Sequence, residues 1–132
     1  MNIVDSSGWL EYFSGGPNTE YFSSPLKDSS SLIVPVITIY EVFKVVLREA
    51  GENEAFQSIA AMQKGQVKDL TINLSMNAAK ISLQHNLPMA DSIIFATAKI
   101  YKCSLWTQDS HFENLPGVNF YPKISTGHRD RE

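Results

Sequence analysis

The chain has almost no cysteine, no long hydrophobic run and no excess of positive charge. Its one cysteine among 132 residues, Cys103, cannot form an internal disulfide, so a reducing compartment such as the cytoplasm is expected. The longest apolar segment, residues 32–47, is interrupted by Pro35 and Glu41 and is shorter than the ~20 residues that a membrane-spanning helix needs. No basic cluster precedes the first apolar residues, and Asp5 follows at once. Neither a membrane anchor nor a secretory signal is therefore expected.

The charge balance limits the kinds of partner that the chain can bind. The net charge is −3, which argues against binding nucleic acid through bulk positive charge. A nuclease is not excluded, because bound cations can make an acidic site attractive to phosphate. Hydrophobic residues make up 43% of the chain, which is enough for one globular domain with one core.

Carboxylates at the edges of apolar segments are the most informative feature. Four such residues stand out: Asp5, Glu41, Asp91 and Asp109. A carboxylate next to buried surface is costly unless something compensates its charge. If the fold gathers all four, their mutual repulsion favours a hard divalent cation such as Mg²⁺. The sequence therefore predicts a metal-dependent active site.

Hydrophobic periodicity and glycine or proline punctuation predict alternating strands and helices. The strands are expected at residues 2–4, 32–35, 67–72, 104–107 and 118–121, and the helices at 7–14, 18–24, 36–50, 52–64, 75–85 and 88–102. This alternation predicts an α/β fold with a mostly parallel central sheet flanked by helices.

Ligands of such sheets bind beyond the carboxyl ends of the strands. Asp5 and Asp109 both follow strands, while Asp91 and Glu41 lie near the starts of helices. We therefore expect all four carboxylates to meet at one edge of the sheet.

Each carboxylate also has a purely structural explanation. Asp5 could cap the helix that follows it, and Asp109 could be an ordinary turn residue after a strand. Asp91 could be a first-turn acid favoured by the helix dipole. Glu41 lies three residues before Lys44, and such a surface pair is worth about 0.2–0.5 kcal/mol. For Asp5 and Glu41 the metal site is favoured, because one ends a central strand and the other lies on a largely apolar helix.

Two residues near the carboxylates are expected to support the site. Thr107 lies two residues before Asp109 on the same side of a strand, so its hydroxyl can bond a site carboxylate or a ligand. Ser6 can act similarly, and it is also the expected N-cap of helix 7–14. His111 is interpreted as a polar loop residue before a buried Phe112, rather than as a general base.

Helix 36–50 is expected to be largely buried. Its polar side chains, at positions 38, 41, 44 and 48, follow helical spacing and form one narrow stripe. The remaining surface of the helix is apolar.

Four segments of the chain form a recognisable set: IVDSS at 3–7, IYEV at 39–42, LPMADSII at 87–94 and LWTQDSHF at 105–112. Together they resemble PIN-domain ribonucleases, and in size the chain resembles VapC-type toxins. The resemblance implies a Rossmann-like PIN fold, which we expect over residues 1–124. The tail at 125–132 has little apolar content, so it is expected to be mobile. It implies an endoribonuclease that uses Mg²⁺ or Mn²⁺, with Asp5, Asp91, Asp109 and Glu41 as catalytic metal ligands. It also implies a homodimer, an RNA substrate and a cognate antitoxin.

Two alternatives remain beside the ribonuclease. An Asp-based phosphohydrolase with Asp5 as nucleophile would need an acid two residues later, where Ser7 stands. A non-catalytic PIN-like module would act through a protein partner and would be indifferent to Mn²⁺.

Overall fold

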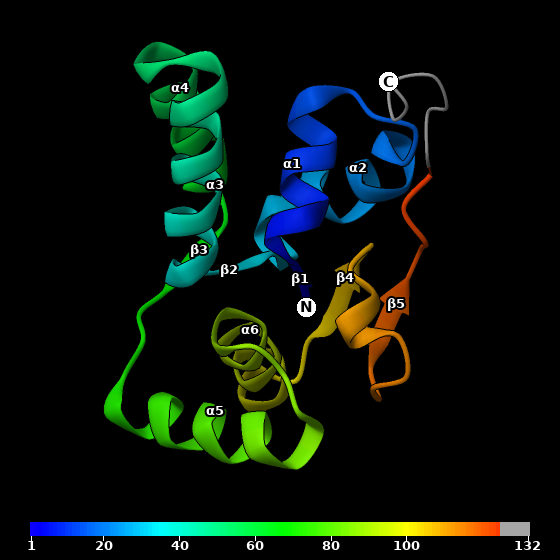
Figure 1. Cartoon of the computed structure of the whole chain (residues 1–132). Coiled ribbons are helices and arrows are strands. Elements are labelled where there is room, and N and C mark those ends of the chain that lie inside the picture. The colour runs from blue at the N-terminus through cyan, green and yellow to red at the C-terminus, as the bar shows by residue number, and fades with distance from the viewer. Residues whose placement is uncertain (125–132) are drawn as a thin grey trace.

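A computed structural model describes residues 1–124 of the chain, within which strands and helices alternate (Figure 1). The strands are β1 (Asn2–Val4), β2 (Ile33–Pro35), β3 (Gln66–Lys68), β4 (Ser104–Thr107) and β5 (Val118–Phe120). The α-helices are α1 (Ser6–Ser14), α2 (Thr19–Lys27), α3 (Val36–Ala50), α4 (Glu52–Met62), α5 (Ile72–His85) and α6 (Met89–Tyr101). Two short 3-10 turns, η1 (Ser29–Ser31) and η2 (Ser110–Phe112), complete the described elements.

The strands form two parallel groups that meet at β1. One group has the order β1-β4-β5 and the other pairs β2 with β3. A parallel bridge between Asn2 and Leu32 joins the groups, so β1 lies in the middle of the combined order. The predicted α/β fold with a mostly parallel sheet is confirmed, and β1 has the central position expected of it.

Helices cover both faces of the sheet and form two cores (Figure 1). Because successive strand residues point to opposite faces, Ile3 packs in the core under α5 and α6, whereas Val4 packs with α1 to α4. Both side chains are completely buried. Burying an aliphatic side chain of this size contributes about 1.5–3 kcal/mol, so β1 is anchored from both sides.

The start of α1 differs from the prediction in one residue. Asp5, rather than Ser6, is the N-cap: its backbone is extended and its carboxylate accepts the Gly8 N–H. Ser6 is already the first residue of the helix, and its hydroxyl is used elsewhere. The helix ends at Gly15, whose φ of 70° lies in the left-handed region that glycine adopts without strain.

Several element boundaries also differ from those predicted. Helix α2 continues through Pro25 to Lys27, beyond the expected end at residue 24. Strand β3 ends at Lys68, because Thr71 caps α5 by accepting the Leu74 N–H and so starts that helix earlier than predicted.

The expectation that α3 is largely buried is wrong. Only Thr38 and Val42 are buried in it, and Tyr40 is 60% exposed. The apolar surface of this helix is wider than the face that the sheet covers.

Two other expectations concern the end of the chain and the membrane. The tail predicted at residues 125–132 lies outside the described residues. Among the described helices, none has both the length and the apolar character needed to span a lipid bilayer.

Candidate metal centre

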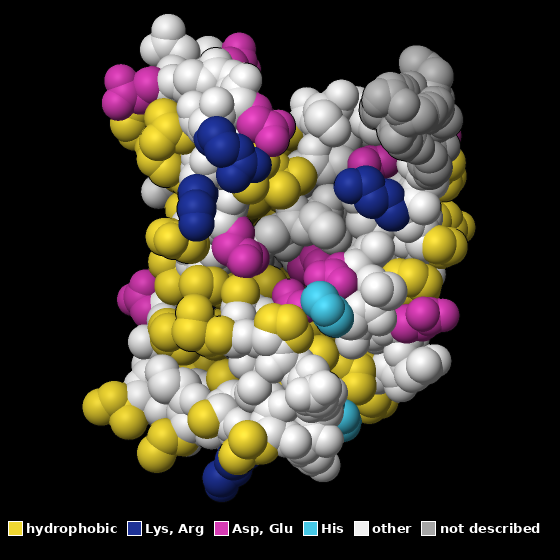
Figure 2. All heavy atoms as spheres, viewed as in Figure 1, with side chains coloured by type: hydrophobic (Ala, Val, Ile, Leu, Met, Phe, Trp, Pro, Cys, Tyr) yellow, Lys and Arg dark blue, Asp and Glu magenta, His cyan; other side chains and the backbone are white. Residues whose placement is uncertain are grey.

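The four carboxylates predicted from the sequence converge beyond the ends of β1 and β4. Asp5 directly follows β1, Asp109 follows β4, Asp91 lies in the first turn of α6, and Glu41 lies in α3. Burial is the main reason why the pKa values of Asp5 and Asp91 are raised. The negative charge of Asp109 adds to both shifts, and that of Glu41 adds to the shift of Asp91, so the four charges lie close enough to interact. Figure 2 shows acidic side chains gathered beside a histidine in the middle of one face.

Asp5 is the most buried of the four, with a relative exposure of 2%. One carboxylate oxygen accepts the Gly8 N–H at 2.9 Å and the Ser7 hydroxyl at 2.8 Å, and the other accepts the Thr107 hydroxyl at 2.6 Å. Burial raises the pKa of Asp5 to about 7, although these hydrogen bonds oppose the rise. The folded chain therefore holds a proton on Asp5 far more tightly than an exposed carboxylate does.

Thr107 connects the Asp5 carboxylate to the backbone of Asp109. Its fully buried hydroxyl donates to Asp5 and accepts the Asp109 N–H at 2.8 Å. This is the bond to a site carboxylate that the position of Thr107 on its strand allowed. The pairing of β1 with β4 brings these groups together, and the Thr107 hydroxyl then orients the Asp5 carboxylate.

Asp91 and Asp109 both contact the same nitrogen of the His111 ring. His111 Nδ1 is 3.0 Å from Asp91 Oδ2 and 3.1 Å from Asp109 Oδ1. Desolvation is the main reason why the pKa of Asp91 rises to about 6, and repulsion from Asp109 adds to it. Asp109, in turn, raises the pKa of His111. The protonation of Asp91 and that of His111 therefore each depend on the charges of the other two side chains.

Glu41 is held by Ser6 rather than by a cation. The Ser6 hydroxyl donates to Glu41 Oε1 at 2.5 Å, across 35 positions of sequence. Within residues 1–124 the surface pair of Glu41 with Lys44 is not formed, and the Lys44 amine lies over the Tyr40 ring instead. The hydrogen bond from Ser6 fixes Glu41 relative to the start of α1, where Asp5 lies.

The donor set fits a hard divalent cation. Carboxylate oxygens are the preferred ligands of Mg²⁺ and similar ions, and Asp91 and Asp109 each leave part of the side chain accessible. No lysine or arginine of residues 1–124 pairs with any of the four carboxylates. Their repulsion is relieved only in part by His111, so an added positive charge is favourable there.

Sequence reasoning missed two features of the centre. The first is the contact of His111 with both Asp91 and Asp109. The sequence does contain a signal for this contact, because His111 lies two residues after Asp109. A tight turn at that spacing brings the second side chain back to the carboxylate. Phe112 is completely buried, as expected.

The second missed feature is a buried polar network behind the centre. The Glu11 carboxylate accepts the Asn18 N–H at 2.7 Å and a Gln108 amide N–H at 3.3 Å. Asn18 also donates to the Gln108 side-chain oxygen and to the Pro122 carbonyl. The network fixes Gln108, and with it the loop between Thr107 and Asp109.

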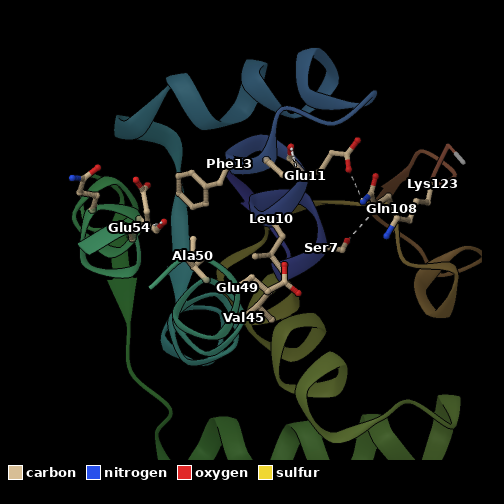
Figure 3. Close-up of a pocket in the computed structure, with 14 residues that line it drawn as sticks. Ser7, Leu10, Glu11, Phe13, Val45, Glu49, Ala50, Glu54, Gln108 and Lys123 are labelled. Carbon is tan, nitrogen blue, oxygen red and sulfur yellow. Dashed lines mark hydrogen bonds between the residues drawn. The ribbon is translucent and has the colours of Figure 1, made fainter. Parts of the chain in front are cut away.

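A groove of about 630 Å³ lies next to the centre, between α1 on one side and α3 and α4 on the other (Figure 3). Its walls are partly apolar, with Leu10 and Phe13 facing Val45 and Val46. Its carboxylates come from three helices: Glu11, Glu49 and Glu54. None of the four carboxylates of the centre lines it, but Ser7 and Gln108 do, and they connect the groove to the loops that carry Asp5 and Asp109.

Comparisons with known proteins agree with this architecture. A family model described as "PIN domain" matches residues 3–118. A comparison with curated proteins found no match.

Three solved structures illustrate the likeness in fold. A toxin–antitoxin complex from Klebsiella pneumoniae aligns with a TM-score of 0.80 at 18% identity, covering 94% of this chain and 100% of that one. The sarcin–ricin-loop-cleaving toxin VapC20 of Mycobacterium tuberculosis aligns with a TM-score of 0.73 at 16% identity, covering 88% and 95%. FitAcB from Neisseria gonorrhoeae aligns with a TM-score of 0.70 at 18% identity, covering 92% and 96%. At these identities the alignments establish the shared fold.

Proposed function

Because the chain belongs to the PIN-domain family, we propose that it is a metal-dependent endoribonuclease and the toxin of a toxin–antitoxin pair. The observation that carries this proposal is the convergence of Asp5, Glu41, Asp91 and Asp109 at the carboxyl ends of β1 and β4. Structural neighbours support the toxin part, since they include a toxin–antitoxin complex and a sarcin–ricin-loop-cleaving toxin.

In the proposed mechanism, Asp5, Asp91 and Asp109 hold Mg²⁺ or Mn²⁺. Glu41 is a further ligand or orients the attacking water. When bound, the ion lowers the pKa of water and stabilises negative charge on the phosphate. The hydrogen bonds of Thr107 and Ser7 keep Asp5 in one orientation, which preorganises the centre for an RNA phosphodiester.

Hydrolysis of this kind needs no side-chain nucleophile, and neither of the two candidates considered within residues 1–124, Cys103 and Asp5, has suitable chemistry. Burial raises the pKa of the Cys103 thiol, so its reactive thiolate form is disfavoured. Asp5 is a poor nucleophile for a phosphohydrolase, because its carboxylate is buried and both of its oxygens accept hydrogen bonds. Ser7, at the position where that class of enzyme needs an acid, donates a hydrogen bond to Asp5.

The groove supports an antitoxin as partner. Its walls combine apolar side chains such as Leu10 and Phe13 with the carboxylates Glu49 and Glu54. Such a surface suits an amphipathic peptide with basic side chains. A peptide seated there would reach Ser7 and Gln108, and so approach the centre without replacing its ligands.

The first experiment is a calorimetric titration of the purified protein with Mn²⁺. We expect wild-type protein to bind and Asp91→Asn to lose binding, because the variant removes one negative ligand. Asp69→Asn, at an exposed position, is the matched control and should bind like wild type. Circular dichroism should show that both variants are folded.

The same proteins are then tested on a panel of structured RNAs. Cleavage by wild type and by Asp69→Asn, but not by Asp91→Asn, is the result expected of a metal-dependent ribonuclease. A correctly folded wild-type protein that binds no Mn²⁺ would contradict the proposal and favour a non-catalytic module that acts through its protein partner.

A further inference from the structure

His111 is carried to the carboxylates by a turn that the core holds in place. The turn is η2, and Asp109 caps it by accepting the His111 N–H at 2.9 Å. The next residue, Phe112, is completely buried and belongs to the core that contains Ile3 and Leu105. The position of His111 is therefore set by packing beneath it, although 55% of its side chain is exposed.

The distances around His111 Nδ1 match those between ligands of one ion. This nitrogen is 3.0 Å from Asp91 Oδ2 and 3.1 Å from Asp109 Oδ1. One ligand atom from each of the three residues lies within 4.8 Å of the others. Neighbouring ligands of an octahedral ion, each about 2.1 Å from it, are separated by about 3 Å. The nitrogen thus has the spacing of a third ligand beside two carboxylates from different elements.

We propose that His111 Nδ1 is a ligand of the divalent ion at this centre and makes the centre prefer Mn²⁺ to Mg²⁺. This inference depends on the proposed function, because it concerns the same ion. Mg²⁺ is a hard cation that takes oxygen ligands, whereas imidazole nitrogen suits transition metals. A centre of carboxylates alone would lack this preference.

Pulsed electron paramagnetic resonance of the Mn²⁺-loaded protein tests the nitrogen directly. We expect hyperfine coupling from a directly bound ¹⁴N in wild type, and its loss in His111→Ala. His85→Gln is the control, since His85 contacts the Phe95 ring rather than the carboxylates, and it should keep the coupling. Because the His111 side chain is largely exposed, His111→Ala should fold normally, which circular dichroism checks.

Calorimetry with Mn²⁺ and Mg²⁺ tests the preference. His111→Ala should weaken Mn²⁺ binding by at least about tenfold, as expected for the loss of a residue that supports a metal site. The same variant should change Mg²⁺ binding by less than about threefold, because the oxygen ligands that Mg²⁺ prefers remain.

The possible outcomes separate this inference from the proposed function. If wild type binds Mn²⁺ and Asp91→Asn does not, the metal centre stands whatever His111 does. If that Mn²⁺ complex shows no ¹⁴N coupling, or if His111→Ala binds Mn²⁺ as well as wild type, His111 is only a hydrogen-bonding neighbour and the inference is wrong. If wild type binds no Mn²⁺ at all, both the inference and the proposed metal dependence are overturned.

Discussion

At the scale of single residues, the burial of Asp5 lowers the stability of the folded chain at neutral pH. Its carboxyl group ends the central strand in a fully buried position, and its pKa is raised from 3.8 to about 7. Below pH 3.8 the group is protonated in both the folded and the unfolded chain. Between pH 3.8 and about 7 only the unfolded chain releases the proton, so the free energy of unfolding falls as the pH rises. Above pH 7 the folded chain also releases it, and the fall ends.

Asp5→Asn should therefore stabilise the metal-free protein at neutral pH. The gain should grow from near zero at pH 4 to at most about 4 kcal/mol at pH 8, since the neutral amide does not have to be charged in the core. Thermal unfolding in EDTA across this pH range measures the difference in the free energy of unfolding between variant and wild type. Asp69→Asn serves as control. A difference in the free energy of unfolding that stays constant with pH would show that Asp5 has an ordinary pKa in the folded chain.

The positions of single residues were only partly predictable. The four carboxylates could be placed at one edge because each borders a strand end or a helix start, and parallel topology brings these points together. Their roles as metal ligands remain predictions. The hydrogen bond between Ser6 and Glu41 could not be predicted, because it depends on how α1 and α3 pack across 35 residues of sequence.

At the scale of elements, the close approach of α1 to β1 and α2 shapes the centre. A Cβ atom added at Gly8 would lie 2.5 Å from Val4 Cγ1 and 2.9 Å from Phe22 Cδ1. Both neighbours are completely buried, so they have little room to move. Gly8 also donates its N–H to Asp5, so a shift of α1 would disturb the centre itself.

Gly8→Ala should destabilise the protein by about 1–3 kcal/mol through this overpacking. Helix propensity alone would predict the opposite sign, a gain of about 1 kcal/mol, so the direction of the change decides between the two effects. Urea unfolding measures the change in the free energy of unfolding. Ser75→Ala, on an exposed part of α5, should stay within about 0.5 kcal/mol of wild type. A Gly8→Ala variant as stable as wild type would mean that α1 moves aside at little cost.

Elements that are bounded by proline or glycine were predicted best. Helix α3 was predicted with its observed bounds, because Pro35 precedes it and Gly51 follows it. Strand β3 was predicted too long, because its apolar residues continue into Leu70 and Ile72, which are exposed. Local sequence could not reveal that Thr71 begins a helix at that point.

At the scale of the whole molecule, an apolar row on α5 faces solvent. Ile72 is 80% exposed, Met76 56% and Leu83 89%. Their spacing follows one side of the helix, and large exposed apolar patches commonly mark protein interfaces. This row is where the homodimer implied by the family resemblance would bury apolar surface.

The double substitution Met76→Lys with Leu83→Lys should therefore shift the protein from dimer to monomer. Charged side chains at the centre of an interface would lose their hydration without a partner. Light scattering coupled to size-exclusion chromatography measures the mass. Gln84→Lys adds one positive charge to the same helix outside the row and should leave the mass unchanged. A double variant that remains dimeric would move the interface to another surface.

The junction between β1 and β2 has a mechanical consequence. Within residues 1–124 the two strand groups share a single bridge, Asn2 to Leu32. One wall of the groove, α1, follows β1, whereas the other wall, α3 with α4, follows β2. Backbone hydrogen bonds between the strand groups are few, so the width of the groove depends on the core in which Val4 and Trp9 pack with Val42 and Met62, and on the hydrogen bond from Ser6 to Glu41. Glu41 belongs to the α3 wall and the three aspartates to the other side. A molecule that bound in the groove and widened it would move Glu41 away from the three aspartates. It would change the geometry of the centre without touching any of the four carboxylates.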